Sequence, residues 1–141
     1  AAPGSPAPDV VVARVVIALR PAPTAELQIA ATDVADPRVV AVKDWLRSNY
    51  TIEENPGMGQ QGYFYYLHLL TKALTASDED RLKLANGAEV LWRDQVAARL
   101  LKLQKADGSW VNPEPRWWEA DPVLVTSYAV MTLEMLEWRM P

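Results

Sequence analysis

Two segments of this chain are so rich in apolar residues that, as helices, they must be covered by other parts of the protein. Residues 63–74 read YFYYLHLLTKAL, and residues 122–136 read PVLVTSYAVMTLEML. In the first segment, apolar side chains almost encircle the predicted helix and leave a narrow polar stripe with His68, Thr71 and Lys72. A helix that is apolar nearly all round has to pack against neighbours on most sides. We therefore expect both helices to be inner helices.

An amphipathic helix precedes each of these segments, at residues 37–47 and 92–105. Asp36-Pro37 and Asp121-Pro122 both place an N-cap aspartate before a proline at the first helical position. Asn-Pro pairs at 55–56 and 112–113 mark the loop within each helical pair. This internal repeat predicts an all-α fold of α-hairpins, arranged as part of an α/α toroid or solenoid.

The remaining segments predict smaller features. Residues 82–91 predict a β-hairpin with a two-residue turn at Asn86-Gly87, inserted between the helical pairs. Residues 1–35 are rich in Ala, Pro, Val and Arg, and we expect a disordered tail at 1–8, a helix or strand at 10–19, with helix favoured, and a helix at 24–34. The predicted organisation is an Ala/Pro-rich segment at 1–35, followed by a repeat domain at 36–141.

Composition excludes several classes of function. A chain of 141 residues suits one domain, and a net charge of -4 does not favour nucleic-acid binding. The absence of cysteine excludes disulfides, thiolate metal sites and a cysteine nucleophile. The longest apolar run, residues 10–19, contains Arg14 and is about half the ~20 residues of a bilayer span, so we expect no transmembrane segment. The sequence does not indicate a cellular compartment.

Gln104, Gly108 and Trp110 define a turn of the form Gln-x-x-x-Gly-x-Trp after the second amphipathic helix. The indole can stack on the plane of the glutamine amide, and the amide can then bond the ends of neighbouring helices. We expect this turn to tie one helical hairpin to the next.

This turn resembles the QW repeat of the squalene-cyclase, terpene-cyclase and protein-prenyltransferase superfamily. The segments NPGMGQQGYFYYLH at 55–68, DGSWVNP at 107–113 and WWEADPVLVTSYA at 117–129 are similar to bacterial proteins with prenyltransferase and squalene-cyclase repeats. The resemblance covers residues 36–138 and matches the C-terminal part of such a protein. It implies an α/α toroid, whose active members cyclise or transfer isoprenoids inside the ring.

The chain departs from this family in ways that bear on catalysis. Arg99 stands where the family has an aromatic residue upstream of Gln104, and the stretch 78–80 does not match the Asp-x-Asp-Asp acid of squalene-hopene-type cyclases. With no cysteine and one histidine, the zinc site of protein prenyltransferases cannot be assembled, so we expect no metal and no cofactor. Two hairpins cannot close a ring of the family's size. We therefore expect the chain to be part of a larger toroid or to form a homo-oligomer.

The residues expected to bind a ligand are Tyr65, Tyr66, His68, Trp117 and Trp118. Tyr65 and His68 would face the cavity, where aromatic rings stabilise carbocations by cation–π attraction. His68 also has a structural interpretation as a hydrogen-bonded rim or core residue. The tryptophan pair either packs over the hairpin end or stacks on a flat or isoprenoid ligand.

Two further patterns have structural explanations. Asp121 is expected to be the N-cap of the helix at 122–136 rather than a catalytic acid. Residues 57–62 fit Gly-x-Gly-x-x-Gly, but the residues before them are polar and end in proline, whereas a dinucleotide site needs a buried strand there. A nucleotide site is therefore disfavoured.

These observations predict part of an isoprenoid- or terpenoid-handling α/α-toroid protein that lacks its own catalytic acid. If active, it would be a terpene-cyclase- or prenyltransferase-like enzyme, with no catalytic residue assigned. The alternative is a non-catalytic α-hairpin module for protein interaction or self-association. A weaker third hypothesis, carbohydrate processing, requires a carboxylate pair at catalytic separation, which the sequence does not reveal.

Overall fold

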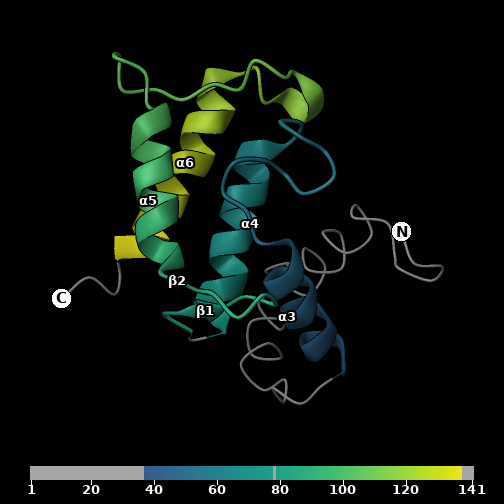
Figure 1. Cartoon of the computed structure of the whole chain (residues 1–141). Helices are drawn as coiled ribbons and strands as arrows, with labels where there is room; N and C mark the ends of the chain where they lie inside the picture. Colours follow the sequence, from purple (N-terminus) through teal and green to yellow (C-terminus); the bar gives the residue numbers. More distant parts are fainter. Residues whose placement is uncertain (1–36, 78, 138–141) are drawn as a thin grey trace, which may run out of the picture.

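The computed structural model describes residues 37–77 and 79–137 (Figure 1). The predictions for a tail at 1–8, a helix or strand at 10–19 and a helix at 24–34 lie outside the described residues. The described elements in chain order are α3 (Pro37–Asn49), α4 (Tyr63–Ala76), β1 (Leu82–Lys83), β2 (Glu89–Val90), α5 (Trp92–Leu103), the 3₁₀ turn η1 (Arg116–Trp118) and α6 (Pro122–Glu137). This confirms the predominantly helical class and the small β-hairpin. A ring built from further hairpins stays a prediction.

Helices α3 and α6 begin where the local sequence predicts, whereas α4 has no capping side chain of its own. Helix α3 begins at Pro37 and α6 at Pro122, each directly after an aspartate. Asp121 Oδ1 accepts a hydrogen bond from the Val123 N–H at 2.9 Å, as an N-cap does. Helix α4 follows Gly62, which has no side chain to cap it. Its first turn therefore needs an acceptor from elsewhere in the chain.

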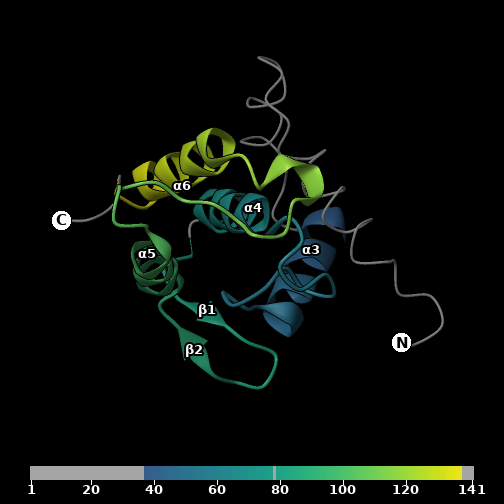
Figure 2. The same cartoon turned by 90° about the horizontal axis from the view of Figure 1, so that it is seen from above.

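Helix α4 lies at the centre of the described structure. It packs mainly against α6, and α5 lies alongside both helices (Figure 2). Helices α4 and α6 begin at the same end of the molecule, and α5 runs in the opposite direction (Figure 1). The β-hairpin lies at the other end, between α3 and α5 (Figure 2).

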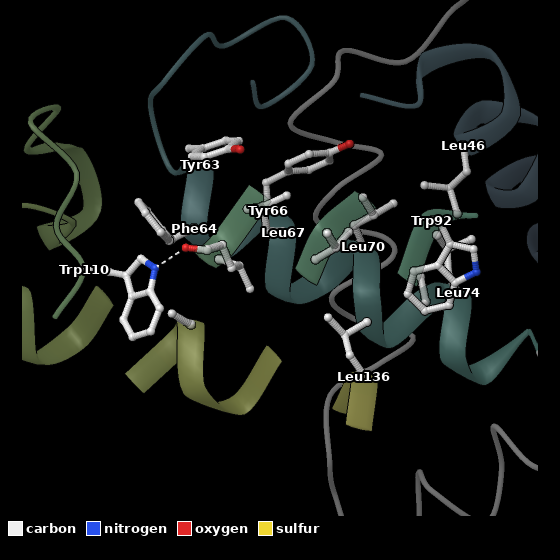
Figure 3. Packing of buried hydrophobic residues seen from close by; sticks show 14 of the residues in the cluster. Leu46, Tyr63, Phe64, Tyr66, Leu67, Leu70, Leu74, Trp92, Trp110 and Leu136 are labelled. Carbon is white, nitrogen blue, oxygen red and sulfur yellow. Dashed lines mark hydrogen bonds between the residues drawn. The ribbon is translucent and has the colours of Figure 1, made fainter. Parts of the chain in front are cut away.

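The core is built around α4, of which nine of 14 residues are buried. These side chains pack against buried residues of the surrounding helices and of the loop after α5 (Figure 3), among them Leu46, Trp92, Val96, Leu100, Trp110, Val125, Ala129 and Leu136. The prediction that α4 is covered on most sides is confirmed.

The matching prediction for α6 is not borne out by the described residues, which cover this helix on one side. Its buried residues, Val125, Ala129, Thr132 and Leu136, share one face. On the opposite face, Val123 is 74% exposed, Val130 42% and Met131 41%. Helices α4 and α5 lie against one flank of α6, and none of the described helices lies on the other (Figure 2).

The β-hairpin has a three-residue loop rather than the predicted two-residue turn. The Leu84 N–H donates to the Ala88 carbonyl at 2.8 Å, and the Gly87 N–H donates to the Leu84 carbonyl at 3.0 Å. A two-residue type I′ turn requires positive φ at both central positions. Gly87 has a φ of 87°, whereas Asn86 is not among the described residues with positive φ. The loop at 85–87 therefore uses glycine alone in the left-handed conformation.

The turn after α5 is held differently from the prediction. Trp110 is buried, and its Nε1 donates to the Leu100 carbonyl at 2.8 Å, which pairs a carbonyl of the last turn of α5 (Figure 3). Gln104 is exposed, and its Nε2 donates to the Gly108 carbonyl at 3.0 Å. The expected buried amide between neighbouring helices does not form, because the Gln104 side chain bonds a carbonyl of its own turn.

Candidate functional site

A buried carboxylate, Glu119, joins the loop before α6 to the start of α4. Glu119 is 1% exposed. Its Oε1 accepts from the Tyr65 N–H at 2.8 Å, and its Oε2 accepts from the Phe64 N–H at 3.2 Å and from Asn112 Nδ2 at 2.7 Å. The N–H groups of the first helical turn have no partner within the helix. Glu119 therefore supplies the cap that Gly62 cannot.

The two Asn-Pro pairs fasten both long loops to the segment just before α4. Asn112 Nδ2 donates to the Gln60 carbonyl at 2.6 Å, and Asn55 Nδ2 donates to the Gln61 carbonyl at 2.8 Å. Both asparagines are buried. The paired motifs that suggested a repeat thus lie together and hold the N-terminus of α4.

Trp117 and Trp118 both have a left-handed backbone, with φ of 56° and 67°. Bulky residues keep this costly conformation only where the surroundings fix it. Trp117 packs directly on Gly62, since a Cβ there would lie 2.7 Å from ring atoms Cε3 and Cζ3, and the Arg116 guanidinium covers the indole at 4.5 Å. Trp118 is 79% exposed. Trp117 thus packs over the hairpin end, while Trp118 is exposed to solvent.

Tyr65 and His68 of α4 meet Tyr128 and Thr132 of α6, and these four residues are termed the aromatic cluster. The ring centroids of Tyr65 and Tyr128 are 5.5 Å apart, and those of His68 and Tyr128 are 5.8 Å apart. The Thr132 hydroxyl lies 3.4 Å from His68 Nδ1 and donates to the Tyr128 carbonyl at 2.7 Å. Two of the three predicted ligand residues on α4 are therefore brought together with a tyrosine that the sequence did not single out.

The aromatic cluster lies on the side of α4 that faces away from α5. On the other side, Arg99 of α5 donates to the Tyr63 hydroxyl at 3.0 Å and lies 5.8 Å from the Tyr63 ring. Tyr65 is two residues further on and therefore about 200° round the helix. Tyr65, His68 and Tyr128 are each partly exposed. The cluster is accessible from outside the core.

His68 and Tyr128 of the aromatic cluster are uncharged at neutral pH. Burial, and to a lesser extent the neighbouring charge of Lys72, together lower the pKa of His68 to about 4. Burial also raises the pKa of Tyr128, which keeps its hydroxyl protonated. These two residues therefore present neutral rings rather than a cation or a phenolate.

Tyr66 does not share this surface. It is 3% exposed, its hydroxyl donates to the Thr51 carbonyl at 2.8 Å, and its ring lies in the core (Figure 3). One residue after Tyr65, it points about 100° away round the helix. The prediction that Tyr66 lines a ligand groove with Tyr65 is not supported, because helical geometry directs it inward.

The acidic stretch at 78–80 serves a structural purpose at Glu79. Its Oε1 lies 3.0 Å from Lys43 Nζ and 3.5 Å from Arg47 Nη2, so it fastens α3 to the start of the β-hairpin region. Among residues 37–77 and 79–137, no group of three His, Cys, Asp or Glu side chains is placed to hold a metal. Within the same residues, no helix combines the length and apolar character that crossing a bilayer requires.

The glycines at 57–62 form a loop rather than a nucleotide site. Gly57, Gly59 and Gly62 have φ of 77°, 61° and 63°. The Asn55 N–H donates to the Gly59 carbonyl at 2.8 Å, which closes a tight turn. The segment before them forms no named strand in the described structure, so the requirement of a dinucleotide site is not met.

Sequence reasoning missed the roles of Glu119, Asn112 and Tyr128. In the sequence, Tyr128 is one of many apolar residues in its segment, and Glu119 is a single carboxylate next to two tryptophans. A usable signal for Glu119 was Gly62, because a buried helix without its own cap needs an acceptor from a distant segment. No comparable local signal identifies Tyr128.

Comparisons of the chain with protein-family models, with curated proteins and with solved structures found no match.

Proposed function

We propose that this chain is part of an isoprenoid- or terpenoid-handling helical protein and that the aromatic cluster contacts the apolar ligand. The observation that carries the proposal is the placement of Tyr65, His68 and Tyr128 together and partly exposed on one side of α4 and α6, with His68 and Tyr128 uncharged. Rings of this kind offer apolar area and a negative π face to unsaturated or carbocationic ligands.

The arrangement of the helices supports the same proposal. In an α/α toroid, inner helices run side by side in one direction, and outer helices return on the outside. Helices α4 and α6 have this parallel arrangement, and α5 runs beside them in the opposite direction (Figure 1). The aromatic cluster would then face the cavity. The role proposed is binding, and no residue is assigned a catalytic step.

The proposal is tested by titrating the 141-residue chain with farnesol in a calorimeter and comparing variants whose circular dichroism is unchanged. The double variant Tyr65→Leu/Tyr128→Leu removes both rings, and we expect affinity to fall about thirtyfold, since aromatic contacts are worth about 1 kcal/mol each. Tyr65→Phe/Tyr128→Phe keeps the rings and should bind within about twofold of the original chain.

Tyr50→Phe is the matched control, because its hydroxyl contacts Gln95 of α5 at 2.7 Å, away from the cluster. It should leave binding unchanged. Absence of measurable binding by the unmodified chain would refute the proposed function. Binding that survives loss of both rings would refute the proposed site.

A further inference from the structure

The β-hairpin loop at 85–87 presents an Asn-Gly pair to solvent. Asn86 and Gly87 are both exposed, and no other asparagine of the chain precedes a glycine. In such a pair the backbone nitrogen of the glycine can attack the asparagine side-chain carbon Cγ, because glycine has no side chain to block the approach. The loop therefore combines an accessible side-chain amide with an unhindered nucleophile.

The other three asparagines lack this combination. Asn55 and Asn112 precede proline, whose nitrogen has no hydrogen to lose. Asn49 is the last residue of α3 and precedes a bulky tyrosine, and its Nδ2 donates to the Trp45 carbonyl at 2.9 Å. The fold and the sequence thus single out Asn86.

The hydrogen bonds of the loop favour the attack. Asn86 Oδ1 accepts from the Ala88 N–H at 3.0 Å, which is an Asx turn and folds the side-chain carbonyl back over the Gly87 nitrogen. The same bond stabilises the negative charge that develops on Oδ1 as Cγ becomes tetrahedral. The Gly87 N–H donates to the Leu84 carbonyl at 3.0 Å, and opening this one bond first slows the reaction by about two- to tenfold.

We propose that Asn86 is a site of spontaneous deamidation. The Gly87 nitrogen loses its proton and forms a bond to Asn86 Cγ, the Cγ–Nδ2 bond breaks, and Nδ2 takes up a proton and leaves as ammonia. Water then opens the resulting succinimide ring at either carbonyl and gives aspartate or isoaspartate at position 86. Either product adds one negative charge to the formal net charge of -4. This proposal does not depend on the ligand proposed above.

The isoaspartyl product should weaken the attachment of α3. The Ala85 N–H, next to the modified residue, donates to the Arg47 carbonyl of α3 at 3.0 Å. Isoaspartate routes the main chain through its Cβ, which adds one carbon to a loop of three residues and shifts Ala85 relative to α3. The aspartyl product keeps the original backbone length. Loss of the Ala85 bond should raise hydrogen exchange at this amide about two- to tenfold.

Peptide mapping by mass spectrometry tests the site on the full chain aged at mildly alkaline pH. A synthetic peptide of residues 82–91 gives the rate without the fold. We expect position 86 to convert within about tenfold of the peptide rate and the other three asparagines to stay intact. Asn86→Gln is the control, because its longer side chain closes a larger ring more slowly. An intact Asn86 in the folded chain while the peptide converts, or faster conversion at Asn49, would overturn the proposal.

Residue-resolved amide exchange by NMR tests the effect on α3. The aspartyl and isoaspartyl forms of the aged chain give separate signals, and Asn86→Asp supplies the added charge on a normal backbone. Exchange at Ala85 should be about two- to tenfold faster in the isoaspartyl form than in Asn86→Asp. Equal exchange in the two would overturn the link between the modification and α3.

Discussion

At the scale of single residues, the start of α4 depends on Glu119. Gly62 gives this helix a left-handed entry but no capping side chain, so the acceptor comes from the loop before α6. The same carboxylate accepts from Asn112, which also holds the loop before α4. One buried charge therefore sets the relative position of the two hairpin loops and, with them, of Tyr65 and the aromatic cluster.

Replacing Glu119 by glutamine should destabilise the protein by about 1.5–3 kcal/mol, the usual range for hydrogen bonds to a charged group. Oε1 accepts from Tyr65 and Oε2 from Phe64 and Asn112, so an NH2 group in either position would face a donor. Urea unfolding followed by tryptophan fluorescence measures the change. Glu114→Gln, at an exposed position of the same loop, should be neutral. Equal stability of the two variants would contradict the role given to Glu119.

Two glycines with nearly the same backbone angle separate conformational strain from steric clash. Gly62 and Gly59 have φ of 63° and 61°, but a Cβ on Gly62 would lie 2.7 Å from the Trp117 ring, whereas one on Gly59 would have no atom of a described residue beyond its chain neighbours within 4 Å. Gly59→Ala should cost about 1–2 kcal/mol from the left-handed backbone alone. Gly62→Ala should cost about 1–3 kcal/mol more from overpacking. Thermal unfolding compares them, and similar midpoints would show that Trp117 is not fixed against Gly62.

At the scale of elements, the contact between α4 and α6 includes the chain's single histidine. The His68 ring lies 5.8 Å from the Tyr128 ring, and burial with the charge of Lys72 lowers its pKa in the folded protein to about 4. In the unfolded chain, histidine titrates near pH 6.5. Between these values the unfolded chain binds the proton that the folded protein does not, so stability must fall as pH decreases.

The free energy of unfolding should therefore drop by about 1–3 kcal/mol as pH falls from about 6.5 to 4, and this contribution should level off below pH 4. Partial exposure of His68 places the loss toward the lower value. Urea unfolding at several pH values measures it, with His68→Gln as the control that removes this pH dependence. The imidazole proton signals in NMR give the pKa directly, and a value near 6.5 would contradict the buried contact.

How far the sequence predicts each element depends on whether its cause is local. The Asp-Pro starts of α3 and α6 and the hairpin at Asn86-Gly87 follow from neighbouring residues, and the structure contains all three. The aromatic cluster and the Glu119 cap join segments more than 50 residues apart, which no local pattern specifies. The apolar composition of α6 indicates that this helix needs to be covered on many sides. Composition does not indicate whether the described residues provide that cover, and for α6 they do so on one side.

At the scale of the whole molecule, α4, α5 and α6 share one core, whereas α3 is attached at its edge. Among the described residues of α3, Leu46 is buried in that core, and Val42 and Trp45 pack partly buried against it. The helix is also held by the ion pairs of Lys43 and Arg47 with Glu79 and by the bond from the Ala85 N–H to the Arg47 carbonyl. Regions with few buried contacts open before the core does. Amide exchange should therefore be faster in α3 than in α4.

Glu79→Gln should raise exchange at the amides of α3 from Ala41 onward about two- to fivefold and leave α4 unchanged. This corresponds to the loss of about 0.4–1 kcal/mol, the range of part-exposed ion pairs. The Trp92 Nε1 donates to the Glu79 backbone carbonyl at 2.6 Å, so the substitution keeps that contact and removes only the charge. Asp44→Asn is the matched control, because Asp44 lies 3.8 Å from Arg47 at a side-chain exposure of 68% and does not reach the β-hairpin region. Faster exchange throughout α4 in Glu79→Gln would show instead that α3 and the core open as one unit.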